Sequence, residues 1–282
     1  MGKYKKILVA VDGSAASLHA LEETIKLTDA VFTAVAVVPP YGGDLRLVGV
    51  RNIRQQLRQP LEKALEVAGE LAAHAGVRLR TILAEGEPYE EIVDLADAEE
   101  ADLIVMGVKG KEIMERLMIM GTTIARVIGY SQTDVLAVPE GVPLTWTRML
   151  LPVDGSKYSK AATARALELA RLYGAELTVM TATDLPPATY GIAPGMAEDL
   201  IVKLKGFLAK ITDQAQALGL TAVALVKDGE APEAITALAR ERQIGLIIMG
   251  SHGRSGLKRL LLGSVTERVI ATSPCPVLVV KL

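Results

Sequence analysis

The chain has 282 residues, half of them apolar and only 4% aromatic, and its formal net charge at pH 7 is −2. This near-neutral balance favours neither nucleic-acid nor membrane binding, and no apolar run is long enough to span a bilayer. The one cysteine, Cys275, excludes an intrachain disulfide, suits a reducing compartment and is interpreted as a packed thiol. Because a strand pattern starts almost at the N-terminus and leaves no room for a signal peptide, we expect a cytoplasmic protein.

Strand and helix patterns alternate through the first half of the chain. Strands are predicted at Ile7–Val11, Thr33–Val38, Val77–Leu83, Leu103–Met106 and Val135–Val138. Helices are predicted after Ser14, over Ile53–His74 and Pro88–Glu99, and from about Thr122. The apolar residues are mainly Val, Ile, Leu and Ala, a mix that is typical of parallel strands buried on both faces beneath helices.

The second half repeats this order, with strands predicted at Met149–Val153, Leu177–Ala182, Thr221–Val226, Leu246–Met249 and Val277–Val280. The sequence Val-Asp-Gly-Ser occurs at Val11–Ser14 and again 142 residues later, at Val153–Ser156. A period near half the chain indicates two copies of a whole domain, predicted at residues 1–140 and 148–282 with Pro139–Thr147 as the linker. Each copy is expected to be an α/β domain of the Rossmann-like kind, an open five-stranded parallel sheet with helices on both faces.

A glycine-rich segment follows the fourth strand of each copy. The second copy has Gly250-Ser-His-Gly253 and then Gly263-Ser264, and the first copy has Gly107-Val-Lys-Gly110 and then Gly121-Thr122. A strand, a glycine loop and a helix start in this order expose backbone N–H groups to a phosphate. Glycine in such a loop permits a positive φ and a close approach of the backbone.

An aspartate ends the first strand of each copy, at Asp12 and Asp154. Ligands of open α/β sheets bind at the carboxyl ends of the strands, where the strand order reverses. We therefore predict that strands one and four are neighbours and that the aspartate faces the glycine loop, where its carboxylate can accept hydrogen bonds from ribose hydroxyls or an amino group. The alternative is that Asp-Gly-Ser only stabilises a strand-to-helix turn.

Nine residues separate Gly253 from Gly263, so the second copy fits the pattern Gly-x2-Gly-x9-Gly-(Ser/Thr). Together with the repeated aspartate, this pattern resembles the universal stress protein family in its tandem form, and the resemblance covers nearly all of both halves. It implies a nucleotide-dependent stress regulator that holds ATP, with Mg²⁺ or Mn²⁺ on the phosphates, and acts through an unidentified protein partner. It also implies that the halves pack as an intramolecular pseudo-dimer, pairing Val135–Val138 with Val277–Val280, and it allows a homodimer.

The resemblance further implies which residues bind the nucleotide. Pro152 and Asp154 would lie at the adenosine end, and Ala182 would offer backbone groups to the adenine. The residues implied around the rest of the nucleotide, phosphates included, are Met249, Gly250, His252, Gly253, Arg254, Gly263, Ser264 and Val265. In the first copy, the residues implied around a nucleotide are Asp12, which corresponds to Asp154, and Val37, Met106, Gly107, Gly110, Gly121 and Thr122. For His252, a solvated loop position is the alternative.

The two glycine segments are not equivalent. Ser264-Val-Thr-Glu267 is a capping-box sequence, which predicts a fixed helix start beside the phosphates. In the first copy ten residues separate Gly110 from Gly121, and Thr122-Thr-Ile-Ala125 lacks the acid of the capping box. We therefore expect the principal ATP site in the C-terminal domain, and for the first copy a simple turn is the alternative.

No catalytic constellation is recognisable in the sequence. There is no Ser-His-Asp set at a recognisable spacing, no Cys/His cluster for a metal and no Walker sequence. Binding is therefore expected rather than turnover. Two other functions remain open. One is slow ATP hydrolysis or phosphoryl transfer, including autophosphorylation, for which the candidate acceptors are Ser251, His252, Ser264 and Thr266. The other is a protein-interaction module that binds no nucleotide.

Overall fold

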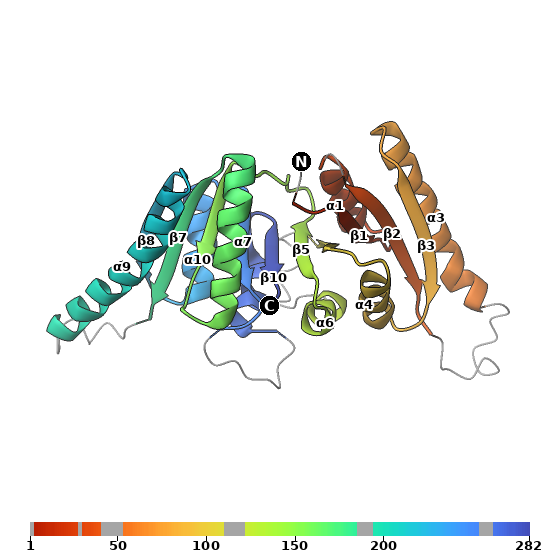
Figure 1. The fold of residues 1–282 in the computed structure, drawn as a ribbon. Helices are drawn as coiled ribbons and strands as arrows, with labels where there is room; N and C mark the ends of the chain where they lie inside the picture. The colour runs from red at the N-terminus through yellow and green to blue at the C-terminus, as the bar shows by residue number, and fades with distance from the viewer. Residues whose placement is uncertain (1–2, 28–29, 41–52, 110–121, 185–193, 254–261) are drawn as a thin grey trace. The chain divides into compact units, whose positions relative to one another are not determined.

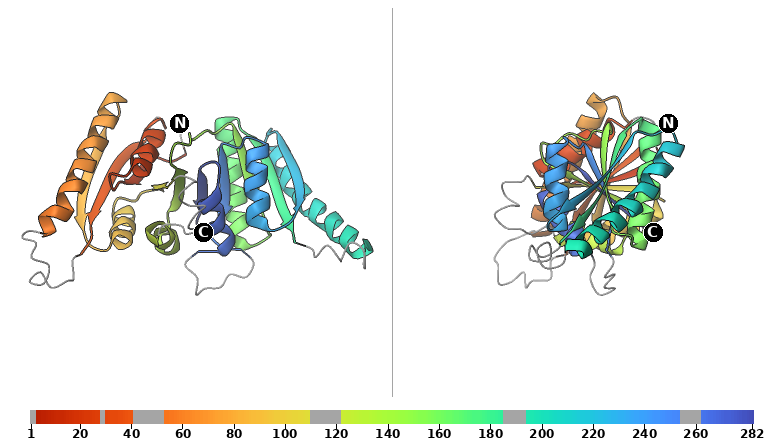
Figure 2. Two further views of the ribbon diagram at one scale, coloured as in Figure 1. Left: turned by 180° about the vertical axis from the view of Figure 1, so that it is seen from behind. Right: turned by 90° about the vertical axis from the view of Figure 1, so that its left-hand side faces the viewer.

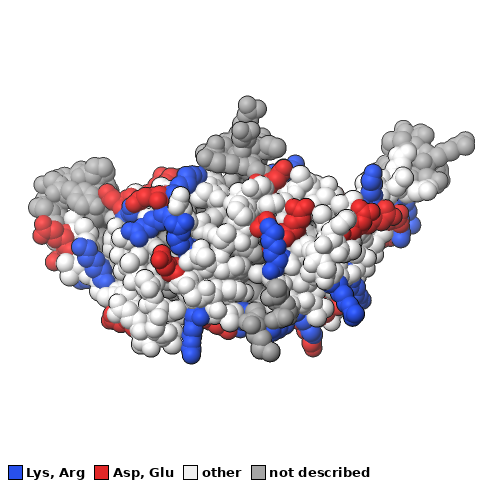
Figure 3. Space-filling view, turned by 90° about the horizontal axis from the view of Figure 1, so that it is seen from above, with Lys and Arg blue, Asp and Glu red and all other residues white. Residues whose placement is uncertain are grey.

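The computed structural model of the protein describes residues 3–27, 30–40, 53–109, 122–184, 194–253 and 262–282. These residues form two compact units, an N-terminal unit that runs to Gly141 and a C-terminal unit that starts at Val142. Within the described ranges, no helix has the length and apolar character needed to cross a membrane. Basic and acidic side chains are interspersed on the face shown in Figure 3, in keeping with the net charge of −2.

The N-terminal unit alternates strands and helices along the chain (Figure 1). Its elements are β1 (Lys6–Ala10), α1 (Ala15–Ile25), β2 (Val31–Val38), α3 (Ile53–His74), β3 (Leu79–Glu85), α4 (Pro88–Ala98), β4 (Leu103–Val108), α6 (Thr122–Tyr130) and β5 (Asp134–Pro139). The strands are parallel and lie in the order β3-β2-β1-β4-β5. Because right-handed crossovers change direction between β3 and β4, α1 and α3 cover one face of this sheet and α4 and α6 cover the other.

The C-terminal unit repeats the same topology. Its elements are β6 (Arg148–Pro152), α7 (Lys157–Tyr173), β7 (Glu176–Thr183), α9 (Pro194–Ala217), β8 (Ala222–Asp228), α10 (Ala231–Glu241), β9 (Leu246–Gly250), α11 (Ser264–Thr272) and β10 (Val277–Val280). The strands are again parallel, in the order β10-β9-β6-β7-β8, and helices flank them on both sides (Figure 2). The predicted fold class is confirmed, and strands one and four are neighbours in each unit.

The third strands begin later than the sequence predicts, at Leu79 rather than Val77 and at Ala222 rather than Thr221. In the N-terminal unit the reason is the end of α3. Gly76 adopts a left-handed φ of 69°, and the N–H of Val77 donates to the carbonyl of Ala72 at 2.9 Å. Val77 therefore closes the helix rather than opening the strand, as the residue after a C-terminal glycine does.

The central strands carry the core of each unit. Leu103, Ile104 and Val105 of β4 are fully buried, as are Leu246–Ile248 of β9. Cys275, just before β10, is buried as predicted for a packed thiol, and this burial raises the pKa of its thiol to about 12. Because helices cover both faces of each sheet, the carboxyl ends of the strands have fixed positions. The candidate site lies at these ends.

Candidate functional site

The turn after the first strand of each unit is built by Asp-Gly-Ser. In the C-terminal unit Oδ1 of Asp154 accepts the N–H of Ser156 at 2.9 Å, and Oγ of Ser156 then caps α7 by accepting the N–H of Ser159 at 3.1 Å. Asp12 and Ser14 do the same before α1. The glycines between them, Gly13 and Gly155, have φ of 80° and 83°, a conformation that glycine adopts without steric cost. The turn-forming role proposed as an alternative for both aspartates is therefore observed.

The hydrogen bonds of this turn also set the ionisation of Asp12. Burial raises the pKa of its carboxyl, but the hydrogen bonds from Ser14 and Ser17 outweigh that cost and hold the pKa below its ordinary value. One of them, from Oγ of Ser14 to Oδ1 of Asp12, is 2.6 Å long, as expected for a charge-assisted bond. The carboxylate of Asp12 is thus engaged within its own turn.

Gly107 and Gly250 are required by packing rather than by a positive φ. Neither has a φ between +20° and +160°, nor does Gly253, so of the two properties that glycine permits here, Gly107 and Gly250 use the close approach of the backbone. A Cβ on Gly250 would lie 2.7 Å from the backbone carbon of Tyr158, and a Cβ on Gly107 would lie 2.3 Å from that of Ala16. Each glycine lets the first turn of α7 or α1 pack directly against the fourth strand.

The start of α11 differs from the predicted capping box. The N-cap residue is Gly263, which has no side chain to cap the helix, and Ser264 is the first helical residue. The N–H of Gly263 donates to the carbonyl of Ser251 at 2.9 Å, and Oγ1 of Thr266 donates to the carbonyl of Gly250 at 2.9 Å. These two bonds from the body of the unit fix the helix start in place of a cap, so its first N–H groups have no capping side chain.

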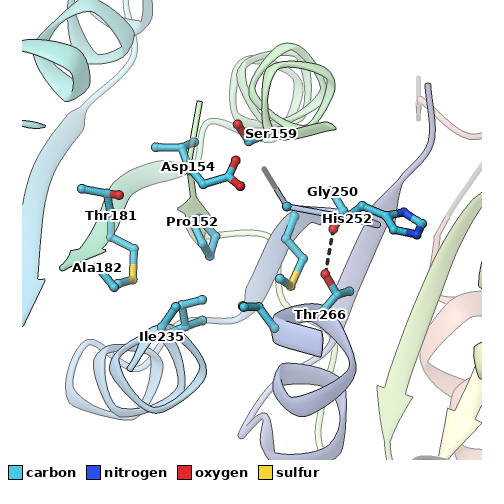
Figure 4. A pocket seen from close by; sticks show the side chains of 15 residues that line it. Pro152, Asp154, Ser159, Thr181, Ala182, Ile235, Gly250, His252 and Thr266 are labelled. Carbon is cyan, nitrogen blue, oxygen red and sulfur yellow. Dashed lines mark hydrogen bonds between the residues drawn. The ribbon is translucent and has the colours of Figure 1, made fainter. Parts of the chain in front are cut away.

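A pocket lies between these elements, at the carboxyl ends of β6, β7 and β9 (Figure 4). The space between its lining residues is about 590 Å³, open solvent included. Eight of the predicted residues line it: Pro152, Asp154, Ala182, Met249, Gly250, His252, Gly253 and Val265. An adjoining cleft shares Asp154 and Gly253 with this pocket and adds Gly263 and Ser264. Arg254, the remaining predicted residue of this unit, lies outside the described residues.

His252 lines the pocket edge but its imidazole points away from Asp154 (Figure 4). The ring lies 5.1 Å from the ring of Tyr158, and Nδ1 is 3.1 Å from Oγ of Ser251. Lys157 in turn places its ammonium 4.9 Å from the centre of the Tyr158 ring. This packing holds the loop against α7.

Several lining residues were not predicted from the sequence. They are Val153, Ser159, Met180, Thr181, Ala231 and Ile235, whereas Thr266, which also lines the pocket, was predicted only as a candidate phosphoryl acceptor. Ser159 accepts the N–H of Gly155 on its Oγ at 3.1 Å, and its counterpart Ser17 accepts the N–H of Asp12 at 3.2 Å. That serine stands five residues after the aspartate in both copies, so the repeat contained a usable signal. Ile235 belongs to the apolar face of α10, and nothing local in the sequence distinguishes it from a core residue.

The N-terminal unit places Asp12, Val37, Met106 and Gly107 at the corresponding strand ends, and Thr122 begins α6. Gly110 and Gly121 lie outside the described residues. The strand after Gly107 behaves differently from its counterpart, because β4 continues to Val108, whose carbonyl accepts the N–H of Glu140 at 2.9 Å. The carbonyl of Ser251, the counterpart of Val108, instead accepts the N–H of Gly263. The two units therefore use the same position for different bonds.

The chemistry offered by the C-terminal pocket is that of a binding site with few charges. The part of its lining that the structure describes contains Asp154 and, in the adjoining cleft, Asp184, and no lysine or arginine. Within the same described residues, no group of three or more His, Cys, Asp or Glu side chains is arranged to hold a metal. Positive potential comes from the open N-terminus of α11, whose dipole and N–H groups favour an anion.

Fold and topology define a tandem protein of two doubly wound α/β domains. The model of the Universal stress protein family matches residues 3–139 and 145–281, so the chain belongs to the universal stress protein family. A universal stress protein of Mycolicibacterium smegmatis is 27% identical over 299 residues, which cover 98% of this chain and 96% of that relative. Universal stress protein MJ0531 of Methanocaldococcus jannaschii is 34% identical over 140 residues, covering 48% of this chain and 82% of the relative.

Among solved structures, a universal stress protein from Archaeoglobus fulgidus superimposes with a TM-score of 0.72 at 22% identity. The match covers 98% of this chain and 96% of that one. It supports the tandem α/β fold over the full length of the chain.

Proposed function

We propose that the protein binds ATP in its C-terminal unit and acts as a nucleotide-dependent stress regulator. The observation that carries the proposal is the convergence on one pocket of Asp154 after β6, Gly253 after β9 and the start of α11. Asp154 is about a hundred residues from the other two parts in the sequence, and all three meet where the strand order reverses, which is where open α/β sheets bind their ligands.

The lining suits the parts of an adenine nucleotide in turn. Pro152, Met180, Ile235 and Met249 supply apolar contacts for a base, and Ala182, near the end of β7, lines the same pocket and offers its backbone groups to the adenine. Asp154 accepts hydrogen bonds from ribose hydroxyls. Gly253, Ser264 and Val265 hold the phosphates through backbone N–H groups, Gly263 lets the phosphate chain approach the helix start closely while its own N–H donates to Ser251, and Mg²⁺ or Mn²⁺ is carried on the phosphate oxygens.

Binding rather than turnover is the proposed activity. Of the four candidate phosphoryl acceptors, Ser251 and Thr266 are both 2% exposed, and the hydroxyl of Thr266 is bound to the carbonyl of Gly250. Ser264 is the exposed one of the four. A single-turnover assay with labelled ATP is expected to show hydrolysis far slower than the roughly 1–10³ per second of ordinary enzymes.

The assembly is part of the same proposal. The domains are taken as residues 1–140 and 148–282, packed as an intramolecular pseudo-dimer in the cytoplasm, and the regulator signals its nucleotide state to a protein partner. The N-terminal unit keeps the strand-end aspartate and Gly107 without serving as the principal site.

Mass spectrometry of small molecules released from the purified, denatured protein tests this function directly. We expect adenine nucleotide in the extract, and tight binding when the stripped protein is titrated with ATP. An extract without nucleotide, together with no heat of binding on titration, would assign the protein to the class of interaction modules that bind no nucleotide.

A further inference from the structure

The hydroxyl of Thr266 makes a bond that no other described threonine in a helix makes. Threonines inside helices usually bond a carbonyl three or four residues back in the same helix. Five helical threonines here follow that rule: Thr24, Thr163, Thr212, Thr236 and Thr272. Thr266 instead reaches back 16 residues and donates to the carbonyl of Gly250, at the end of β9, at 2.9 Å.

This bond works together with the one from the N–H of Gly263 to the carbonyl of Ser251. Two consecutive carbonyls at the end of β9 therefore hold two points of the helix start, its N-cap and its third residue. We call this pair of bonds the α11 clamp. Since Gly250 is itself packed against the backbone of Tyr158, the clamp ties α11 to both β9 and α7.

We propose that Thr266 is a positioning residue that sets the affinity of the protein for the phosphates of its nucleotide, an inference that rests on the proposed function. The N–H groups of Ser264 and Val265 stand between the two ends of the clamp, and both residues line the cleft. Hydrogen bonds from a helix N-terminus to phosphate need fixed donors, and Gly263 provides no capping side chain to fix them. The hydrogen bond from the Thr266 side chain fixes the position of these N–H donors and leaves the N–H groups themselves available to phosphate.

The N-terminal unit supplies an internal comparison. The residue 142 positions before Thr266 is Ile124, which has no hydroxyl, and the residue matching Ser251 is Val108, whose carbonyl accepts from Glu140. Ile124 is buried, as Thr266 is. The buried position has thus been kept in both copies, and the hydroxyl belongs only to the copy proposed to hold phosphates.

The experiment compares Thr266→Val, Thr266→Ser and the control Thr272→Val, each titrated with ATP and with adenosine. Thr272 lies in the same helix and makes the ordinary bond to the carbonyl of Arg268. Thr266→Val is expected to weaken ATP binding about tenfold, the equivalent of about 1.4 kcal/mol, and to leave adenosine binding unchanged. Thr266→Ser restores ATP affinity, and Thr272→Val does not alter it.

Hydrogen exchange of the ligand-free proteins separates the clamp from the ligand. Thr266→Val is expected to speed exchange of the hydrogen-bonded amides of Gly263 and Glu267, at the start of α11, about tenfold, with Thr266→Ser near wild type. Equal losses of ATP and adenosine affinity, or no rescue by serine, would overturn the positioning role. Unchanged exchange would overturn the clamp whatever nucleotide binds. A wild type that binds neither ATP nor adenosine would overturn the proposed function and the phosphate role, while the exchange rates would still decide the clamp.

Discussion

The segments that follow β4 and β9 start from the same sequence pattern and end in different structures. After Gly107 the N-terminal unit extends its strand to Val108 and pairs it with Pro139. After Gly250 the C-terminal unit leaves the sheet, and the carbonyls of Gly250 and Ser251 accept hydrogen bonds from the start of α11. What the copies share serves the fold, and what they do not share lies where phosphates would bind. Repetition of a residue is therefore weak support for a binding role.

The shared glycines should show the largest effect, and it should fall on stability in both units. Gly107→Ala and Gly250→Ala each place a Cβ 2.3–2.7 Å from the backbone of the helix that follows the first strand. Backbone atoms cannot move aside cheaply, so each substitution is expected to cost about 3 kcal/mol of unfolding free energy or more. Denaturant unfolding measures this, with Gly206→Ala, on a helix with open space around it, as the control. A neutral Gly250→Ala would mean that ligand contact, not packing, requires this glycine.

Substitution of the two equivalent aspartates should distinguish a role in the fold from a role in binding, with effects smaller than those of the glycine substitutions. Asp154→Ala and Asp12→Ala remove the same turn bond, so both should lower stability by a similar amount. Only Asp154→Ala should weaken ATP binding, by roughly 1.5–3 kcal/mol, or about 10- to 100-fold in affinity. Calorimetric titration of both variants checks this. Equal affinity in the two variants would reduce Asp154 to a turn residue.

The ionisation of Asp12 gives a finer test of its turn role. Because its folded pKa lies below the ordinary value of 3.8, its carboxylate contributes stability above that pH and loses it as the pH falls through the folded pKa. Asp12→Asn keeps the acceptor oxygen and removes the charge. The variant should be slightly less stable than wild type at pH 7, and this difference in stability should close as the pH falls below 3.8 and through the folded pKa of Asp12. A gap that stays constant with pH would show that the charge of Asp12 has no part in the turn.

The smallest predicted difference is in thermal stability, and it concerns the contact of α11 with α10 and the corresponding contact of α6 with α4. Arg268 of α11 bonds Glu230 at 2.8 Å and also Glu233, just before and within α10. Its counterpart Arg126 lies over the ring of Tyr89 at 5.0 Å. Arg268→Ala should lower the melting temperature slightly. The decrease should be smaller in about 1 M salt, where the Debye length falls to about 3 Å and exposed ion pairs are screened. Arg126→Ala removes stacking on a ring and should respond less to salt. An identical salt dependence of the melting temperature in the two variants would contradict the assignment of an ion pair to Arg268 and of a ring contact to Arg126.

The sequence predicted the parts of this molecule that depend on periodicity. Val, Ile and Leu runs located all ten strands, and turn signals at their ends placed the glycine loops and both aspartates at one edge of each sheet. The long helix predicted over roughly Ile53–His74 is present, and it ends at His74 as predicted. These features depend on local residue patterns, which a single sequence contains.

Features set by contacts distant in sequence were not predicted. Ser264-Val-Thr-Glu267 has the form of a capping box, yet the helix begins one residue after Gly263, because bonds to Ser251 and Gly250 override the local signal. The steric need for glycine at position 250 depends on where α7 packs. Thr266 was considered only as a candidate phosphoryl acceptor, and its bond to Gly250 was not predicted because that partner lies 16 residues away. The assignment of the nucleotide to this site remains a prediction.

Calorimetric titration with ATP of the wild type, Gly253→Val and Gly110→Val tests the central claim most directly. A Cβ on Gly253 would lie 3.1 Å from Oδ2 of Asp154, inside the proposed site. The account predicts one tight site per chain, which Gly253→Val largely removes and Gly110→Val leaves nearly intact. Two equal sites in the wild type, or a larger loss from Gly110→Val, would contradict the assignment of the C-terminal unit as the principal nucleotide site.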